Sequence, residues 1–115
     1  MCKNIELFKN MKIELLYFDG CPTYGKALKD LEEVVAELGV DTRPTLIKVE
    51  SDEDAVRLQF LGSPTIRING VDIEQPLSLA TQFGLSCRIY KQNGKMLGSP
   101  SKEMLREAIK AARTR

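Results

Sequence analysis

The chain has 115 residues, of which 43% are hydrophobic and 29% are charged, as is typical of one globular domain with a single core. Its net charge is +1 and its basic residues are interspersed with acidic ones, so we expect neither nucleic acid nor a membrane as a partner. The chain contains no histidine, which excludes an imidazole base, a Ser–His–Asp triad and a histidine metal ligand.

The three cysteines, Cys2, Cys21 and Cys87, are the remaining candidates for a reactive group. Residues 1–10 lack the apolar core of a signal peptide, and we expect them to form a short extension to one domain over residues 11–115. No apolar run has the length of a membrane span. We therefore expect a cytoplasmic protein with free or catalytic thiols. Without a C-x-x-C pair or a Gly-rich phosphate loop, no structural zinc and no cofactor are expected.

The first expected elements are a strand and a helix. Lys12–Phe18 is mostly apolar and favours a strand. Pro22 fits the first position of the following helix, because the N–H group that proline lacks is one that a helix leaves unpaired. This places Cys21 at or near the helix N-cap. The apolar face of the helix is predicted from residues at intervals of three and four: Ala27, Leu28, Leu31, Val34, Val35 and Leu38.

The next segment predicts two strands, a short helix and a hairpin. A second strand is expected at Thr45–Glu50, followed by a short helix that Ser51 caps. A third strand at Thr65–Ile68 ends at Asn69-Gly70, a strong signal for a tight hairpin turn. Val71–Ile73 is then expected to return antiparallel to the third strand.

The last third of the chain is less regular. A short helix is expected at Leu77–Phe83, a strand at Cys87–Tyr90, and a turn at Asn93-Gly94 toward Met96-Leu97. Ser101 is expected to cap a final helix with the apolar face Met104, Leu105, Ala108, Ile109 and Ala112. This order predicts an α/β fold in which a parallel strand–helix–strand unit with a right-handed crossover joins a hairpin. The mixed central sheet would have four to five strands, with helices on both faces.

Cys21 lies where the first strand gives way to the first helix. Unpaired N–H groups and the positive end of the helix dipole favour a thiolate there, which is the nucleophilic and metal-binding form of cysteine. The alternative is a buried structural thiol, because free cysteine is among the most buried residue types. The position at a strand-to-helix turn favours a reactive cysteine.

Asp19 acts against this preference, because a carboxylate near the thiol disfavours the thiolate. It is either a turn residue or a proton relay beside Cys21. Lys26 and Arg67 are the candidates to offset its charge.

Pro64 directly precedes the third strand and on its own would be an ordinary trans proline at a strand start. Together with the Cys21 turn, it resembles the thioredoxin fold, in which a cis-proline before the third strand lies against the active-site cysteine. The resemblance covers the chain from Met11 to about Ala112. It implies a cis Pro64 and a Ser63 backbone that pairs with an extended thiol substrate. The substrate-binding positions that it implies are Pro22, Thr23, Tyr24, Ser63, Pro64 and Thr65.

A closer resemblance is to short thioredoxin-like proteins sometimes called the DF family. It rests on Tyr-Phe-Asp-Gly-Cys-Pro at Tyr17–Pro22 and Leu-Gly-Ser-Pro-Thr at Leu61–Thr65. Some members are thought to carry selenocysteine at the position of Cys21, which implies nucleophilic redox use of the site. The chain departs from thioredoxin at Tyr24, where the second cysteine of a C-x-x-C motif would stand. Cys21 is therefore a monothiol resolved by an external thiol, a partner of Cys87, or a ligand that does not turn over.

Three functions are compatible with these features. The favoured one is a thiol oxidoreductase in which Cys21 carries out thiol–disulfide exchange and Cys87 or an external thiol resolves it. Its partner would be a disulfide-bearing protein or a low-molecular-weight thiol. The first alternative is a non-catalytic binding module that uses the groove beside Pro64. The second is a soft-metal or organomercurial-handling protein with Cys21 and Cys87 as thiolate ligands.

Overall fold

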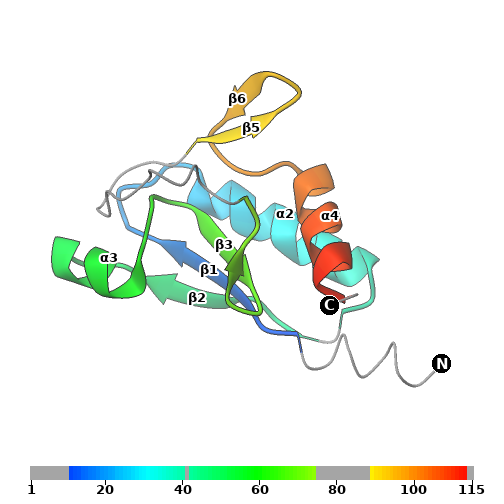
Figure 1. The fold of residues 1–115 in the computed structure, drawn as a ribbon, viewed down its shortest axis with the longest axis horizontal. Coiled ribbons are helices and arrows are strands. Elements are labelled where there is room, and N and C mark those ends of the chain that lie inside the picture. Colours follow the sequence, from blue (N-terminus) through cyan, green and yellow to red (C-terminus); the bar gives the residue numbers. More distant parts are fainter. Residues whose placement is uncertain (1–10, 41, 75–88, 114–115) are drawn as a thin grey trace.

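The computed structural model describes residues 11–40, 42–74 and 89–113 (Figure 1). The predicted helix at Leu77–Phe83 and the cysteines Cys2 and Cys87 lie outside these ranges. The elements, in chain order, are β1 (Ile13–Tyr17), α2 (Tyr24–Glu37), β2 (Thr45–Lys48), α3 (Asp52–Leu58), β3 (Thr65–Ile68), β4 (Val71–Asp72), β5 (Tyr90–Gln92), β6 (Lys95–Leu97) and α4 (Lys102–Arg113).

Strand β1 lies inside a four-stranded sheet with the order β2-β1-β3-β4. It pairs in parallel with β2 and antiparallel with β3, where Leu15 faces Ile66. Strand β4 returns antiparallel to β3 after a turn in which Asn69 (φ 54°) and Gly70 (φ 83°) are both left-handed. Such turns match the twist of the strands that they join. The predicted parallel unit, hairpin and mixed sheet are therefore confirmed.

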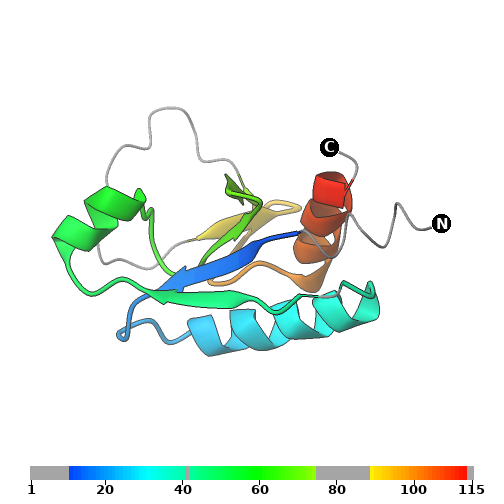
Figure 2. The same ribbon diagram turned by 90° about the horizontal axis from the view of Figure 1, so that it is seen from below.

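Helices cover both faces of the sheet, because successive side chains of a strand point to opposite faces. Figure 2 shows α2 and α3 on opposite sides of β1 and β2. The larger core lies under α2 and α4 and includes Ile13, Leu15, Ala27, Leu31, Val34, Val35, Ile66, Ile68, Leu105, Ile109 and Ala112. The smaller core under α3 consists of Leu16, Val49, Ala55 and Phe60. This arrangement is the predicted α/β fold of thioredoxin-like type.

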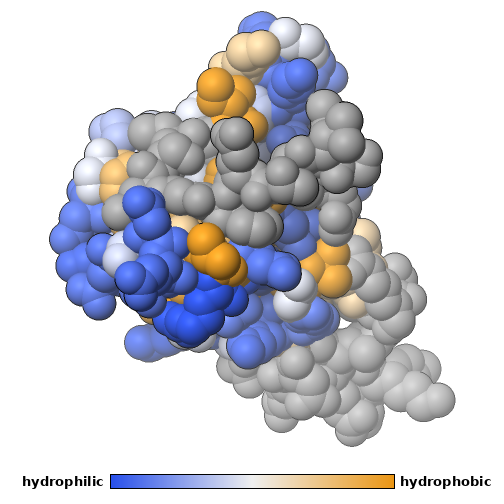
Figure 3. All heavy atoms as spheres, turned by 60° about the vertical axis from the view of Figure 1, so that its left-hand side comes forward, coloured by the Kyte–Doolittle hydropathy of each residue, from blue (hydrophilic) through white to orange (hydrophobic). Residues whose placement is uncertain are grey.

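Strands β5 and β6 form a separate two-stranded sheet, in which Tyr90 faces Leu97 and Lys91 faces Met96. In the sequence this hairpin lies between β4 and α4, and in space it projects from the domain beside the start of α2 (Figure 1). Figure 3 shows apolar side chains on the projecting hairpin, at the top of that view, among hydrophilic ones. The turn at Asn93-Gly94 is confirmed, but the strand starts at Tyr90 and so lies later than expected.

The N-caps of two helices are confirmed. Ser51 Oγ accepts a hydrogen bond from the Asp54 backbone N–H (3.1 Å), and Ser101 Oγ accepts one from the Met104 N–H (3.2 Å). Such caps satisfy N–H groups that the first turn of a helix leaves unpaired. Among the described helices, none combines the length and the apolar character needed to cross a membrane.

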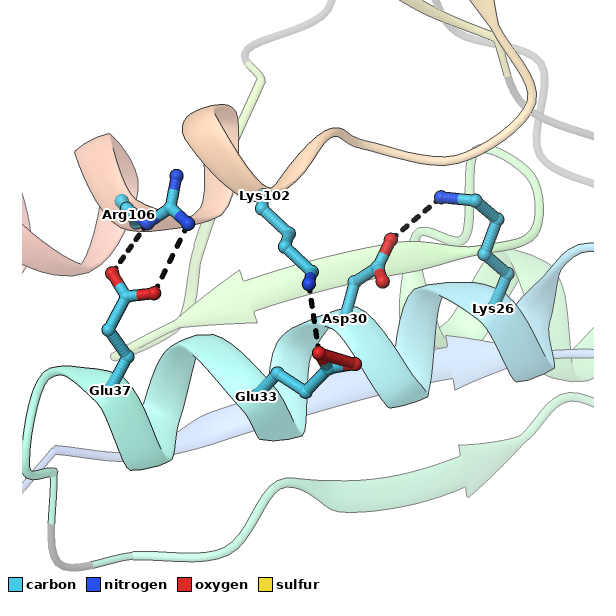
Figure 4. Close-up of polar contacts among 6 residues, drawn as sticks. All are labelled: Lys26, Asp30, Glu33, Glu37, Lys102 and Arg106. Atoms are coloured by element: carbon cyan, nitrogen blue, oxygen red, sulfur yellow. Dashed lines mark hydrogen bonds and ion pairs between the residues drawn. The ribbon is translucent and has the colours of Figure 1, made fainter.

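Ion pairs join α4 to α2 on the outer side of the larger core (Figure 4). Lys102 Nζ lies 2.8 Å from Glu33 Oε1, and Arg106 holds both oxygens of Glu37 at 2.6 and 3.1 Å. The hydrogen bond from Arg106 lowers the pKa of the Glu37 carboxyl. Exposed pairs of this kind contribute little stability, so we assign them to setting the orientation of α4 on α2.

Candidate functional site

Cys21 closes the turn that follows β1. Its backbone N–H donates to the Phe18 carbonyl (3.1 Å), which makes residues 18–21 a β-turn. A side chain at Gly20 would displace the Phe18 ring, because its Cβ would lie 2.7 Å from Phe18 Cε2. The turn leaves Cys21 with a free thiol and only 4% of its surface exposed.

Helix α2 begins later than the sequence predicted. Its N-cap is Thr23 and its first residue is Tyr24, and the first helical hydrogen bond runs from Ala27 N to Thr23 O (3.1 Å). The placement of Pro22 as the first helical residue was therefore wrong, whereas Cys21 lies near the N-cap, two residues before it. The physical reason is the turn: the hydrogen bond that Cys21 makes back to β1 holds the chain outside helical geometry until Thr23.

The sulfur of Cys21 nevertheless lies against the start of α2. Burial alone would raise the pKa of the Cys21 thiol. The nearby Ser63 and Thr23 hydroxyls and the backbone N–H groups of Thr23 and Tyr24 together outweigh burial, and the pKa of Cys21 lies below its ordinary value. The helix thus favours the thiolate as the sequence predicted, but through two amides that follow Cys21.

The Thr23 hydroxyl has one hydrogen and two neighbours. Its Oγ1 donates to the Gly98 carbonyl (2.9 Å) and lies 3.4 Å from Cys21 Sγ. Either atom could be the donor of the contact with sulfur: the hydroxyl accepts the S–H of the neutral thiol while its hydrogen points to Gly98, and it donates to the sulfur when that hydrogen turns toward a thiolate. The hydroxyl makes no helix-cap bond, which leaves the first amides of α2 available to the sulfur.

Ser63 has no exposed surface, and among the described residues its hydroxyl has no completed hydrogen bond. It does not complete a hydrogen bond to the neutral thiol, yet it is close enough to lower the pKa of Cys21. A buried hydroxyl without a partner is unfavourable, and a thiolate is a much stronger acceptor than a thiol. The Ser63 hydroxyl therefore favours ionisation of Cys21.

The Ser63–Pro64 peptide bond is cis, as the resemblance to thioredoxin implied. Two hydrogen bonds fix this loop: Thr65 Oγ1 donates to the Gly62 carbonyl, and the Tyr90 hydroxyl donates to the Pro64 carbonyl, each at 2.5 Å. The pairing of the Ser63 backbone with a substrate stays a prediction.

Asp19 lies outside the hydrogen-bond network of Cys21. Its carboxylate is 71% exposed and pairs with Lys48 of β2 at 2.7 Å, which raises the pKa of Lys48. The expected partners were wrong, because both are engaged elsewhere. Lys26 pairs one helical turn along α2 with Asp30 at 2.7 Å (Figure 4). Arg67 donates to two carbonyls at the end of α3, at 2.7 and 2.9 Å.

The predicted substrate-binding residues have different surroundings in the structure. Ser63 and Thr23 interact with the thiol, as described above. Tyr24 stacks on Tyr17 with ring centres 4.3 Å apart, which joins the end of β1 to the start of α2. Thr65 has no exposed surface, and Pro22 is exposed.

The sequence analysis did not identify Tyr90 and Gly98, which form hydrogen bonds with Pro64 and Thr23 on the two segments beside Cys21. Their partners Pro64 and Thr23 lie 26 and 75 residues away along the chain. Local patterns carry no signal for contacts at such separations. Only the alternation of apolar residues around Tyr90 indicated that it could face the interior.

A metal cluster and a surface groove are the other places where the described residues could hold a ligand. The described residues hold no group of three or more Cys, Asp or Glu side chains suited to a metal ion. The pairing of Cys21 with Cys87 is not tested, because Cys87 lies outside the described ranges. A groove of 380 Å³ lies between β4 and α4 and does not include Cys21; its carboxylates are Asp72, Glu74, Glu103 and Glu107.

Comparison with known protein families gives one result. Residues 12–109 match the model of a family described as a domain of unknown function, DUF2703. The chain belongs to this family. No curated protein and no solved structure matches the chain. The DUF2703 match includes Cys21, Ser63, Tyr90 and Gly98, so the whole network around the thiol lies within the family domain.

The chemistry available to this DUF2703 domain centres on one sulfur. Cys21 can act as a nucleophile once ionised, because two amides and two hydroxyls favour its thiolate. Those same groups fix the sulfur at the junction of β1, α2 and the cis-proline loop.

Proposed function

We propose that this DUF2703 protein is a thiol oxidoreductase in which Cys21 is the nucleophile. The observation that carries the proposal is the position of the Cys21 thiol between β1 and α2, where its sulfur lies against Thr23 and beside the cis Ser63–Pro64 loop, surroundings that lower its pKa. The unpartnered Ser63 hydroxyl beside it supports the same conclusion. The resemblance to the thioredoxin superfamily and its DF group, through Tyr17–Pro22 and the cis Pro64, is consistent with redox chemistry.

The proposed reaction is thiol–disulfide exchange. The Cys21 thiol loses its proton to solvent, and the thiolate attacks one sulfur of a substrate disulfide. A bond forms between Cys21 and that sulfur, while the second substrate sulfur leaves as a thiolate and takes up a proton. An external thiol, or Cys87, then attacks the Cys21 sulfur of the mixed disulfide, and the substrate sulfur bound to it leaves as a thiol. An external thiol then reduces the new disulfide on Cys21 and frees Cys21. The substrate becomes reduced and the resolving thiol becomes oxidised.

The test is the rate of iodoacetamide alkylation of Cys21 as a function of pH, with mass spectrometry to assign the modified cysteine. We expect labelling of Cys21 to begin well below the ordinary thiol pKa of about 8.5. The Cys21→Ser variant is the control for labelling at Cys2 and Cys87. Incubation with glutathione disulfide should also yield a mixed disulfide on Cys21. Labelling that follows an ordinary thiol pKa, with no mixed disulfide, would show that Cys21 is not a redox nucleophile.

A second candidate function is a binding module without turnover. The low exposure of Cys21, 4%, favours it, because a nucleophile must reach its substrate. The same measurement separates the two candidates: a module would leave Cys21 unmodified by glutathione disulfide while the folded protein remains intact.

A further inference from the structure

The segment that joins β6 to α4 contacts the start of α2 through Gly98 (Figure 1). The Gly98 carbonyl accepts the hydroxyl hydrogen of Thr23, the N-cap residue of α2, at 2.9 Å. A Cβ on Gly98 would lie 3.3 Å from Thr23 Cγ2, which is closer than side-chain carbons usually approach. Glycine therefore lets the main chain come this near. Three residues later, Ser101 caps α4, so the contact joins the start of α2 to the segment that leads into α4.

The same hydroxyl oxygen of Thr23 lies 3.4 Å from the Cys21 sulfur. Because a threonine hydroxyl carries one hydrogen, it can donate fully to only one of these two neighbours at a time. The side chain of Thr23 makes no helix-cap bond, so the amides of α2 do not hold it in place. The hydrogen bond to Gly98 therefore fixes this oxygen beside the sulfur.

The charge on the sulfur decides which neighbour receives the hydrogen. A neutral thiol is a weak acceptor, so the hydrogen stays on the Gly98 carbonyl while Thr23 Oγ1 accepts the S–H. A thiolate is a charged acceptor, and charge-assisted hydrogen bonds are roughly twice as strong as neutral ones, so the hydrogen turns to the sulfur. In a mixed disulfide the Cys21 sulfur carries neither a proton nor a charge, and the hydrogen returns to Gly98.

The described elements around this hydroxyl bring no charged side chain to it. Hydroxyls and amides are the groups that offset the effect of burial on the pKa of Cys21. Residues 61–65 and 98–101 are all uncharged. The titratable side chains nearby have other contacts: Asp19 with Lys48, Lys26 with Asp30, Tyr24 with Tyr17, and Tyr90 with the Pro64 carbonyl.

We infer that Gly98 is a positioning residue for Cys21 and acts through the single hydrogen of the Thr23 hydroxyl. Its carbonyl holds Thr23 Oγ1 against the thiol and releases the hydrogen when the sulfur ionises. It takes the hydrogen back when the sulfur enters a mixed disulfide. This inference rests on the proposed function and adds to it the residue that couples the nucleophile to the segment leading into α4.

Carbon-13 NMR of the Gly98 carbonyl tests the inference, because a carbonyl resonance moves upfield when the carbonyl loses a hydrogen bond. In a pH titration of the wild-type protein, we expect this resonance to move upfield with the midpoint at which Cys21 ionises. Thr23→Val keeps the shape of the side chain without the hydroxyl and should lose most of the movement. Thr23→Ser, which retains the hydroxyl, should keep it. Conversion of Cys21 to its mixed disulfide with glutathione should return the resonance to its position in the neutral thiol.

The same variants should differ in the reactivity of Cys21. At a pH below the ordinary thiol pKa, Thr23→Val should be alkylated about fivefold more slowly than the wild-type protein, because its thiolate lacks one hydrogen bond. Thr23→Ser should restore most of the rate. The matched control is Thr45→Val, at an exposed position on β2, which should change neither the rate nor the Gly98 titration.

A Gly98 resonance that stays constant while Cys21 ionises overturns the inference. A movement that persists in Thr23→Val overturns it as well, because the charge of the thiolate alone would then account for the movement. Failure of Cys21 to form a mixed disulfide with glutathione disulfide overturns the proposed function instead. The two failures are distinguishable, because the pH titration of Gly98 requires no substrate.

Discussion

Replacing Tyr90 with phenylalanine removes one hydroxyl from the contact between the hairpin and the cis-proline loop. The ring of Tyr90 has no exposed surface, and its hydroxyl donates to the Pro64 carbonyl at 2.5 Å. Phenylalanine keeps the packing of the ring but leaves a buried carbonyl without this donor. The cost of an unsatisfied buried polar group is about 1–3 kcal/mol. For a domain of this size, this corresponds to a decrease in Tm of roughly 5–15 °C.

The measurement is urea unfolding followed by circular dichroism, with Tyr24→Phe as the matched control. The Tyr24 ring stacks on Tyr17, and its hydroxyl makes no hydrogen bond with a described residue. The control should therefore change the free energy of unfolding by less than about 0.5 kcal/mol. An unchanged denaturant slope would show that the Tyr90 variant lost stability rather than cooperativity. If both variants are equally stable, the hydroxyl of Tyr90 does not hold the loop as described.

Three further predictions concern the thiol. Ser63→Ala should raise the pKa of Cys21 in the alkylation profile, whereas Ser51→Ala, which costs about 1 kcal/mol through loss of a helix cap, should leave it unchanged. The pKa of Cys21 in the folded protein lies below the reference value of 9.0. At pH values between these two pKa values, the unfolded chain therefore holds the Cys21 proton that the folded protein has lost. The free energy of unfolding should therefore rise with pH across that window, and this contribution should be lost as the pH falls through the pKa of the folded protein. In urea titrations at several pH values, Cys21→Ser should abolish this dependence. Asp19→Asn should not alter the Cys21 profile, because its carboxylate pairs with Lys48; a shifted profile would restore its role as a proton relay.

Local signals in the sequence predicted the elements well where the chain itself supplies the cause. Thr65–Ile68 forms a strand with the expected bounds because its apolar alternation ends at a turn that Asn69 and Gly70 accommodate. Ser51 and Ser101 cap their helices because a serine side chain reaches the free amides of the first turn.

The start of α2 could not be predicted in the same way. The preference of proline for the first helical position is a weak one, and a hydrogen bond between Cys21 and Phe18 overrides it. The hydrogen bonds of Tyr90 and Gly98 depend on how distant segments meet, which periodicity does not encode. The sequence therefore identified Cys21 together with Thr23 and Ser63, but not the contacts of Tyr90 and Gly98 that hold the loops beside them.

The long separation between Thr23 and Gly98, 75 residues, has a consequence for protein synthesis. Gly98 and the hairpin are synthesised long after Cys21, so the groups that lower the pKa of Cys21 are not all in place in the nascent chain. The acidity of Cys21 develops only when the later segments have folded against it. The rate at which Cys21 is alkylated at mildly acidic pH therefore reports completed folding of the domain, without an added label.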